Sequence, residues 1–219
     1  MAQPADDSAH PSLGFERIVF FSDAVFAIVI TLLVLPLTAE IDLSEEGAGG
    51  LASEVWELRQ TVLSFVVSFL VIGQFWLAHH RMFGQLERHD QGLIWLNLIC
   101  LLTVSFLPFP TAVLGEHSTA EDRFAIVFYA ASMTVTSVTF SLTWLYALRR
   151  NQVDDRLDRR ARRDSAVRSF ATSAVFLLSI GAAFLGLFPE VLCWVALLPA
   201  IRVVLARLHR QRHEGRLAA

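Results

Sequence analysis

Four side chains capable of polar or aromatic contacts cluster where the chain becomes strongly apolar: Arg17, Phe21, Ser22 and Asp23. Residues 24–39, which follow, contain no charged side chain. If the helix enters the membrane near Arg17, Asp23 lies about one helical turn inside it. A carboxylate there is either an interfacial acid that water reaches or a buried acid held by hydrogen bonds from a neighbouring helix. Arg17 and Asp23 are six positions apart, about 240° around a helix, so they do not face each other. A partner for Asp23 must come from another segment.

A second polar cluster, Trp76, His79 and His80, closes another apolar segment. Side chains one position apart point about 100° apart on a helix, so the two histidines cannot share a metal ion as an i, i+4 pair could. We expect no metal site here. Instead, we expect Trp76 and His80 to make hydrogen-bonding or interfacial contacts, with Asn97 of the next apolar segment as a polar partner between helices.

Enzymatic and nucleic-acid chemistry have no support in the sequence. There is no G-x-S-x-G, no H-E-x-x-H and no glycine-rich phosphate loop, and the net charge is −3. Cys100 and Cys193 both lie in apolar stretches, where they are expected to act as small hydrophobic residues. The chain also lacks a T-V-G-Y-G filter and a ladder of arginines for voltage sensing. We therefore expect no enzyme, no cofactor and no nucleic-acid partner.

The composition indicates a membrane protein. Of 219 residues, 54% are hydrophobic and only 18% are charged, which is more apolar surface than a soluble fold of this size can bury. Four charge-free stretches exceed the roughly 20 residues that a transmembrane helix needs: 60–80, 91–115, 124–148 and 169–189. The stretch 24–39 becomes long enough when it is extended back to Arg17, and a sixth requires Arg202 to reach the headgroups.

We therefore predict an all-α integral membrane protein with six transmembrane helices, at about 17–38, 56–80, 91–115, 122–148, 168–188 and 190–208. The remaining segments are an N-terminal tail, 1–16, and a basic C-terminal tail, 209–219. This arrangement puts 16 of the 18 arginines on one side, whereas the opposite connections are acidic. Both termini are thus predicted to be cytoplasmic. The protein is expected to be multi-pass, in contact with lipid, in a bacterial plasma membrane.

Within the first predicted helix, four residues share one narrow face, at i, i+3, i+4 and i+7: Ile28, Thr31, Leu32 and Leu35. Periodicity alone is explained by ordinary helix packing or by lipid contact. The hydroxyl of a single threonine in such a helix can be satisfied by its own backbone.

The segment Arg17-x-x-x-Phe21-Ser22-Asp23, followed by Ala-Val-Phe-Ala-Ile, resembles the first-helix signature of the transmembrane protein 175 family. This family comprises the endolysosomal potassium channel of animals and its bacterial relatives. The similarity extends to Trp76, His80, Asn97 and the segment 108–111. The six-span length is similar to the single-repeat bacterial form, which assembles as a homotetramer.

The resemblance implies a leak-like potassium channel in which four copies of the first helix line a central pore. Ile28 would be the hydrophobic constriction, Thr31 a polar ring, and Leu32 and Leu35 further apolar rings. The constriction would act as both gate and filter, giving moderate selectivity for K⁺, the permeant ion. The remaining motif residues would brace helix packing at the cytoplasmic end: Arg17, Phe21, Ser22 and Asp23.

Two other functions remain open on the sequence. One is a secondary transporter, coupled to protons through Asp23 or His80, although no convincing repeat relates residues 17–115 to 124–208 and Asp23 lies near one face of the membrane. The other is a structural or lipid-handling membrane protein without transport. Single-channel recording in a planar bilayer separates them, because only a channel gives discrete current steps.

The predicted topology can be tested with single cysteines in a background that lacks Cys100 and Cys193. Ala48→Cys should react with an impermeant thiol reagent in intact cells, and Asp155→Cys only after lysis, because the two loops are predicted to lie on opposite sides. Labelling of both positions from outside would contradict the six-helix topology.

Overall fold

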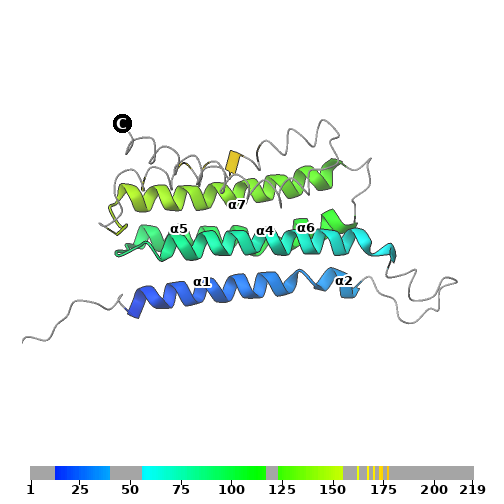
Figure 1. The fold of residues 1–219 in the computed structure, drawn as a ribbon, viewed down its shortest axis with the longest axis horizontal. Helices are drawn as coiled ribbons and strands as arrows, with labels where there is room; N and C mark the ends of the chain where they lie inside the picture. Colours follow the sequence, from blue (N-terminus) through cyan, green and yellow to red (C-terminus); the bar gives the residue numbers. More distant parts are fainter. Residues whose placement is uncertain are drawn as a thin grey trace, which may run out of the picture.

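The computed structural model describes residues 13–39, 56–116 and 123–154, together with scattered positions between 162 and 177. This part of the chain is helical: α1 (Leu13–Leu32), α2 (Leu35–Ala39), α4 (Arg59–Phe83), α5 (Gln91–Phe106), α6 (Pro108–Glu116) and α7 (Arg123–Arg149). Successive long helices run in alternating directions, with α4, α5 and α6 between α1 and α7 (Figure 1). The all-helical prediction is confirmed for these residues.

Four helical stretches are long and apolar enough to cross a membrane: Gly14–Ala39, Arg59–Phe83, Gln91–Glu116 and Phe124–Arg149. They correspond to the first four predicted spans, although the first begins before Arg17 and the second is shifted by three residues. The fifth and sixth predicted spans, and both predicted tails, lie wholly or almost wholly outside the described residues. Because the helices alternate in direction, Arg17 lies at the same end of the bundle as Arg81 and Arg149 (Figure 1).

Prolines interrupt two of these stretches. Pro36 has no N–H to donate to the carbonyl of Leu32, so α1 ends there and α2 begins after the turn at Leu33 and Val34. Pro108 likewise cannot donate to Val104, and the N–H of Leu107 replaces it at 3.1 Å. This turn separates α5 from α6.

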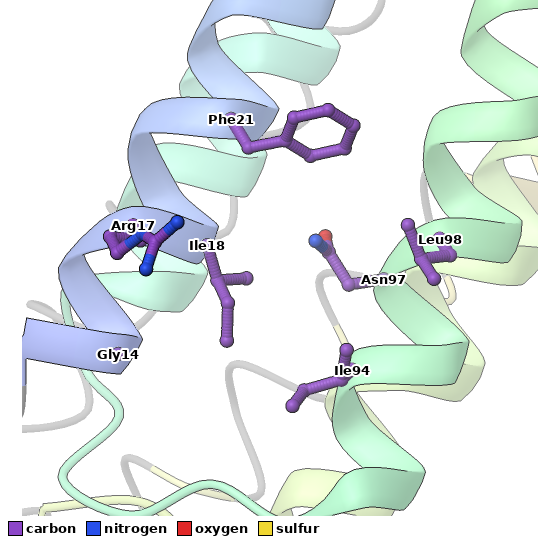
Figure 2. A pocket seen from close by; sticks show the side chains of 7 residues that line it. All are labelled: Gly14, Arg17, Ile18, Phe21, Ile94, Asn97 and Leu98. Atoms are coloured by element: carbon purple, nitrogen blue, oxygen red, sulfur yellow. The ribbon is translucent and has the colours of Figure 1, made fainter.

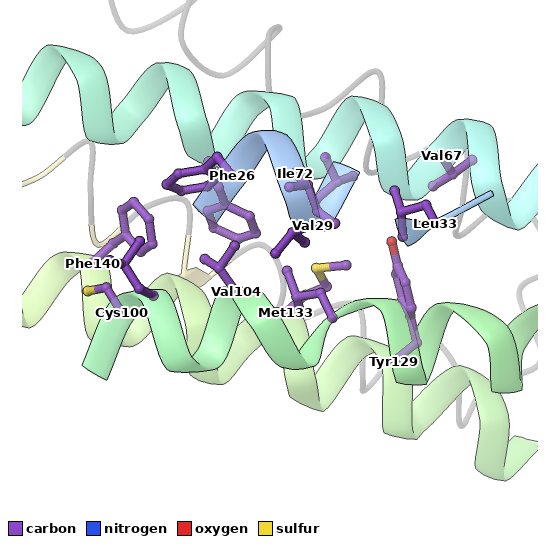
Figure 3. Packing of buried hydrophobic residues seen from close by; sticks show 14 of the residues in the cluster. Phe26, Val29, Leu33, Val67, Ile72, Cys100, Val104, Tyr129, Met133 and Phe140 are labelled. Atoms are coloured by element: carbon purple, nitrogen blue, oxygen red, sulfur yellow. The ribbon is translucent and has the colours of Figure 1, made fainter. Parts of the chain in front are cut away.

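The bundle has an apolar core to which every long helix contributes (Figure 3). From α1 come Phe26, Val29 and Leu33, each at most 2% exposed. They pack in one cluster with side chains from the other helices, among them Ile72, Val104, Met133 and Phe140. This burial fixes which face of α1 points inward.

Buried hydroxyl groups also join the helices. Ser68 of α4 lies 3.0 Å from the hydroxyl of Tyr129 on α7 and 2.9 Å from that of Thr111 on α6. On α7, Thr143 and Thr139 lie 3.1 and 3.3 Å from side chains of α5. In a bilayer such bonds are each worth about 1 kcal/mol, and each of these hydroxyls thereby has a partner inside the bundle.

At the end that holds Arg17, a carboxylate ties α5 to α7. Asp90 accepts hydrogen bonds from the backbone N–H of Leu93 and from the hydroxyl of Tyr146, each at 2.9 Å. Asp90 is thus the N-cap of α5. The bond from Leu93, with further contributions from Gln152, Tyr146 and Arg150, lowers the pKa of Asp90, so this N-cap carboxylate stays ionised at neutral pH.

The segments that flank this cap pair with each other. The carbonyl of Gln152 accepts from the backbone N–H groups of Glu87 and Arg88, and Leu86 forms an antiparallel bridge with Val153. Asn151, with φ of 52°, makes the turn that brings this segment back. A Cβ at Gly92 would collide with the Tyr146 hydroxyl where it bonds to Asp90, so glycine leaves room for this position of the tyrosine.

The close approach of α4 and α6 gives a stability test. A Cβ at Gly115 would lie 2.8 Å from Ser64 Oγ and 3.1 Å from the backbone Cα of Thr61. We expect Gly115→Ala to lower the free energy of unfolding by about 1–3 kcal/mol, measured on purified protein in detergent, because the two helices must separate.

Gly73→Ala is the matched control, since nothing lies within 4 Å of its added Cβ. It should be neutral or stabilising by up to about 1 kcal/mol. Equal destabilisation by both variants would contradict this account of the contact between α4 and α6.

Candidate functional site

The two faces of α1 have opposite environments. Ile28, Leu32 and Leu35 are 57%, 40% and 55% exposed, and Thr31 is exposed beside them. Val29, on the other face, is 2% exposed within the core. The four residues predicted to share one face therefore lie together on the side of α1 that no other described helix covers.

This open face follows a regular spacing. Seven exposed residues lie at alternating intervals of four and three: Arg17, Phe21, Ala24, Ile28, Thr31, Leu35 and Thr38. Phe20, Ala27, Leu32 and Val34 are exposed beside them. A repeat of seven residues per two turns is typical of helices that pack around a common axis. These seven residues together with Leu32, termed here the α1 open face, are apolar except for Arg17 and two threonines.

The threonine hydroxyls have defined orientations. Thr31 Oγ1 donates to the carbonyl of Ile28 at 2.8 Å, and Thr38 Oγ1 donates to that of Leu35 at the same distance. Each hydroxyl thereby donates its single hydrogen within its own helix, which is the arrangement considered for Thr31 from the sequence alone. The oxygen keeps lone pairs that can accept a hydrogen bond or contact a cation. No group of three acidic, histidine or cysteine side chains in the described residues could hold a metal ion.

The motif residues Ser22 and Asp23 bond to neighbouring helices. Asp23 Oδ1 accepts from the indole N–H of Trp76 on α4 at 2.9 Å. Ser22, fully buried, lies 3.0 Å from Asn97 Nδ2 on α5. The structure therefore brings Trp76 and Asn97 to the motif, and Asp23 is held by a neighbouring helix rather than by Arg17.

His79 completes this network, with its Nε2 at 2.8 Å from Asn97 Oδ1. The hydrogen bonds have one consistent direction. Ser22 gives its only hydrogen to the carbonyl of Ile18 at 2.8 Å, so it must accept from Asn97 Nδ2. The amide oxygen of Asn97 then faces His79, whose Nε2 must carry the proton.

Of the two adjacent histidines, His79 is the one whose hydrogen bond joins two helices. His79 is fully buried and stacks on Phe83 with ring centroids 4.2 Å apart. His80 is exposed, and its ring lies 5.7 Å from that of Trp76 on the same helix. The missed signal is helical phase: His79 follows Ile72 and Phe75 on the buried face of α4.

Arg17 and Phe21 border a pocket of about 390 Å³ between α1 and α5. Figure 2 shows Ile94, Asn97 and Leu98 of α5 across from Ile18 and Phe21 of α1. The guanidinium of Arg17 is exposed at this end of α1. Of the motif residues, Ser22 and Asp23 are thus committed to contacts between helices, whereas Arg17 and Phe21 belong to the α1 open face.

Comparison with known proteins gives one consistent match. The family described as endosomal/lysosomal potassium channel TMEM175 matches residues 17–108. A potassium channel of Streptomyces collinus is 37% identical over 172 residues, covering 77% of this chain and 82% of that protein. One of Chamaesiphon minutus is 38% identical over 132 residues, 60% of this chain and 64% of the relative.

A solved structure agrees with these relatives. The crystal structure of a lysosomal potassium-selective channel TMEM175 homologue from Chamaesiphon minutus superposes with a TM-score of 0.76 and 28% identity, covering 88% of this chain and 98% of that one. Animal relatives that match over 94–132 residues carry the name endosomal/lysosomal proton channel, and the chain covers only 18–24% of their length.

The role of Asn97 can be tested by truncation. Asn97→Ala removes the hydrogen bonds to both Ser22 and His79, and should lower the free energy of unfolding by about 2 kcal/mol, since each bond between membrane helices is worth about 1 kcal/mol. The measurement is denaturant or thermal unfolding of the purified protein in detergent.

His80→Ala is the control, because its side chain is exposed, and it should leave the unfolding transition unchanged. If His80→Ala were the more destabilising of the two, the assignment of His79 and Asn97 as the joint between helices would be wrong.

Proposed function

Because the chain belongs to the family of the endosomal/lysosomal potassium channel TMEM175, we propose that it is a leak-like, potassium-permeable channel whose pore is lined by the α1 open face. The family is one of ion channels, so the chain is not an enzyme, and no cofactor is implied. The observation that carries the proposal is the exposure of Ile28, Thr31, Leu32 and Leu35 on a helix whose opposite face fills the core.

In this proposal four copies surround the pore, each with six membrane helices in residues 17–208. Both termini, including the tails 1–16 and 209–219, are cytoplasmic, and the membrane is the plasma membrane of a bacterium. The seven-residue spacing of the α1 open face supports packing of α1 against its own copies, since contact with lipid requires no such repeat. Arg17 and Phe21 fall on the same face and would meet a neighbouring copy.

The conduction mechanism follows from the side chains at each level. A ring of Ile28 offers no hydrogen bonds, so an ion there must give up part of its hydration, and the ring can also empty of water and close. The ring of Thr31 oxygens one turn further replaces some of that hydration. Because K⁺ holds its water less tightly than Na⁺, this sequence of barriers favours K⁺ moderately.

The buried network would set the orientation of this face. Ser22 and Asp23 fasten α1 to α5 and α4, and Phe26, Val29 and Leu33 continue the buried side. The rotation of α1 about its axis is then fixed, with Ile28 and Thr31 outward. We propose that Ser22 and Asp23 position the pore helix and that neither touches the permeating ion.

Secondary transport coupled to protons is the weaker alternative. Asp23 already accepts a hydrogen bond from Trp76, and His80 lies on the surface of the described chain. Neither residue adjoins Thr31 on the α1 open face. Discrete single-channel currents from the purified protein in a planar bilayer would support a channel, and saturable flux without current steps would favour a carrier.

The pore assignment predicts that substitutions on the exposed face of α1 change ion permeation, whereas substitutions on its buried face do not. Ile28→Asn adds hydrogen-bonding groups to the dry ring, so it should raise the current and move the K⁺/Na⁺ permeability ratio toward one. Thr31→Val keeps the shape and deletes the hydroxyl, so it should lower the ratio while the pore still conducts. The measurement is the bi-ionic K⁺/Na⁺ reversal potential of each purified variant.

Two controls make the test specific. Val29→Ala, on the buried face, should leave the reversal potential unchanged. Leu102→Asn places the same amide on α5 at a side chain that is 70% exposed, and it should also have no effect. If these controls shift the potential while Ile28→Asn and Thr31→Val match the wild type, another surface lines the pore.

A further inference from the structure

The pocket between α1 and α5 joins a cationic group to apolar walls. Its volume is about 390 Å³, and the exposed side chain of Arg17 borders it at the end of α1. The walls are Ile18 and Phe21 of α1 and, across from them, Ile94 and Leu98 of α5 (Figure 2). Such a pocket suits an amphiphile that carries an anionic group at one end and a hydrocarbon part at the other.

No carboxylate of α1 is placed to neutralise Arg17. Asp23 accepts a hydrogen bond from Trp76 of α4 and lies about 240° around the helix from Arg17. Among the hydrogen bonds and ion pairs of the described residues, none includes the guanidinium of Arg17. A guanidinium with free N–H groups binds a phosphate through two parallel hydrogen bonds.

A second hydrogen-bond donor lies deeper in the pocket. Asn97 is 2% exposed, and its amide group is turned toward α1 across the pocket (Figure 2). The amide nitrogen carries two hydrogens, and the hydrogen bonds among the described residues account for only one of them, the bond to Ser22. The other hydrogen can be donated to an ester carbonyl of a molecule that occupies the pocket.

The apolar wall of the pocket continues along α5. Ile94, Leu98 and Leu102 are spaced four residues apart, and Leu98 and Leu102 are 39% and 70% exposed. The three residues span about 12 Å along the helix, in the direction that leads from the end of the bundle toward its middle. An acyl chain that starts in the pocket would lie along these side chains.

We propose that this pocket binds an anionic phospholipid of the membrane leaflet at the Arg17 end of the bundle. The phosphate contacts Arg17, an ester carbonyl accepts from Asn97, and one acyl chain lies against Leu98. Further arginines at the same end, Arg81 and Arg149, favour an anionic lipid over a zwitterionic one. The pocket is formed by α1 and α5 of a single copy, so the site does not depend on the proposed pore.

A second copy of α1 is the poorer occupant. The α1 open face contains no acidic side chain, and its single charge is Arg17 itself. Copies of Arg17 brought together would therefore repel one another, whereas a lipid phosphate beside each of them compensates the charge.

The test is the thermal stability of the purified protein in detergent, titrated with phosphatidylglycerol, because a bound ligand raises the unfolding temperature. Arg17→Gln should weaken the apparent affinity about tenfold, since it removes hydrogen bonds from a charged group to the phosphate. Leu98→Trp should abolish the stabilisation by filling the pocket. Phosphatidylcholine should stabilise less than phosphatidylglycerol, and inorganic phosphate, which has no acyl chain, not at all.

Two matched variants serve as controls. Arg149→Gln removes an exposed arginine at the same end but outside the pocket, and Leu63→Trp adds the same bulk to α4 at a side chain that is 50% exposed. Both should keep the wild-type response to phosphatidylglycerol. Equal weakening by Arg17→Gln and Arg149→Gln would overturn the site, because it would indicate general attraction of the lipid to positive charge.

A photoactivatable phosphatidylglycerol with a diazirine in its acyl chain tests the wild-type protein directly, even if a variant fails to assemble. Peptides that contain Leu98 or Leu102 should be labelled, and an excess of unlabelled phosphatidylglycerol should prevent the labelling. Labelling elsewhere only, or labelling that does not compete, would overturn the site. A lipid-insensitive protein whose Arg17→Gln and Leu98→Trp variants lose assembled mass would also overturn it, in favour of a neighbouring copy. The pore is judged separately, by Ile28→Asn.

Discussion

The directed hydrogen bonds from His79 through Asn97 to Ser22 determine how the rest of the bundle is arranged. Hydrocarbon offers no water to satisfy a buried amide or imidazole, so these three groups must meet one another. Together with the bond between Trp76 and Asp23, they hold α1 against two helices at one rotation. The apolar core follows from that rotation, and the exposure of the opposite face follows from it as well.

The sequence predicts the helices well, because charge-free length is a direct consequence of bilayer thickness. It also identifies Trp76 and Asn97, since a polar side chain in such a segment needs a partner. It does not distinguish His79 from His80 by residue type alone, because the two are adjacent and identical. Only the phase of the buried face separates them, and that phase becomes certain once Ile72 and Phe75 are known to point inward.

Other features depend on contacts between distant segments. The cap at Asp90 requires Tyr146, 56 residues away, and room beside Gly92. The bridge between Leu86 and Val153 joins two connections that carry no mutual signal in the sequence. The α1 open face can be predicted from the sequence only in part. Periodicity places Ile28 and Thr31 together, but their exposure is known only once the opposite face is seen to fill the core, and the role in conduction proposed for them rests on the family.

The break at Leu33 and Val34 has a mechanical consequence. One end of α1 is clamped by Ser22 and Asp23, whereas the other is jointed by Pro36, so the helix resembles a stiff rod with a hinge near its tip. Force applied to α2 bends the chain at this hinge without turning the clamped half. The turn of α1 that carries Ile28 therefore keeps its orientation relative to the clamp, whereas the turn that carries Leu35 can move with α2.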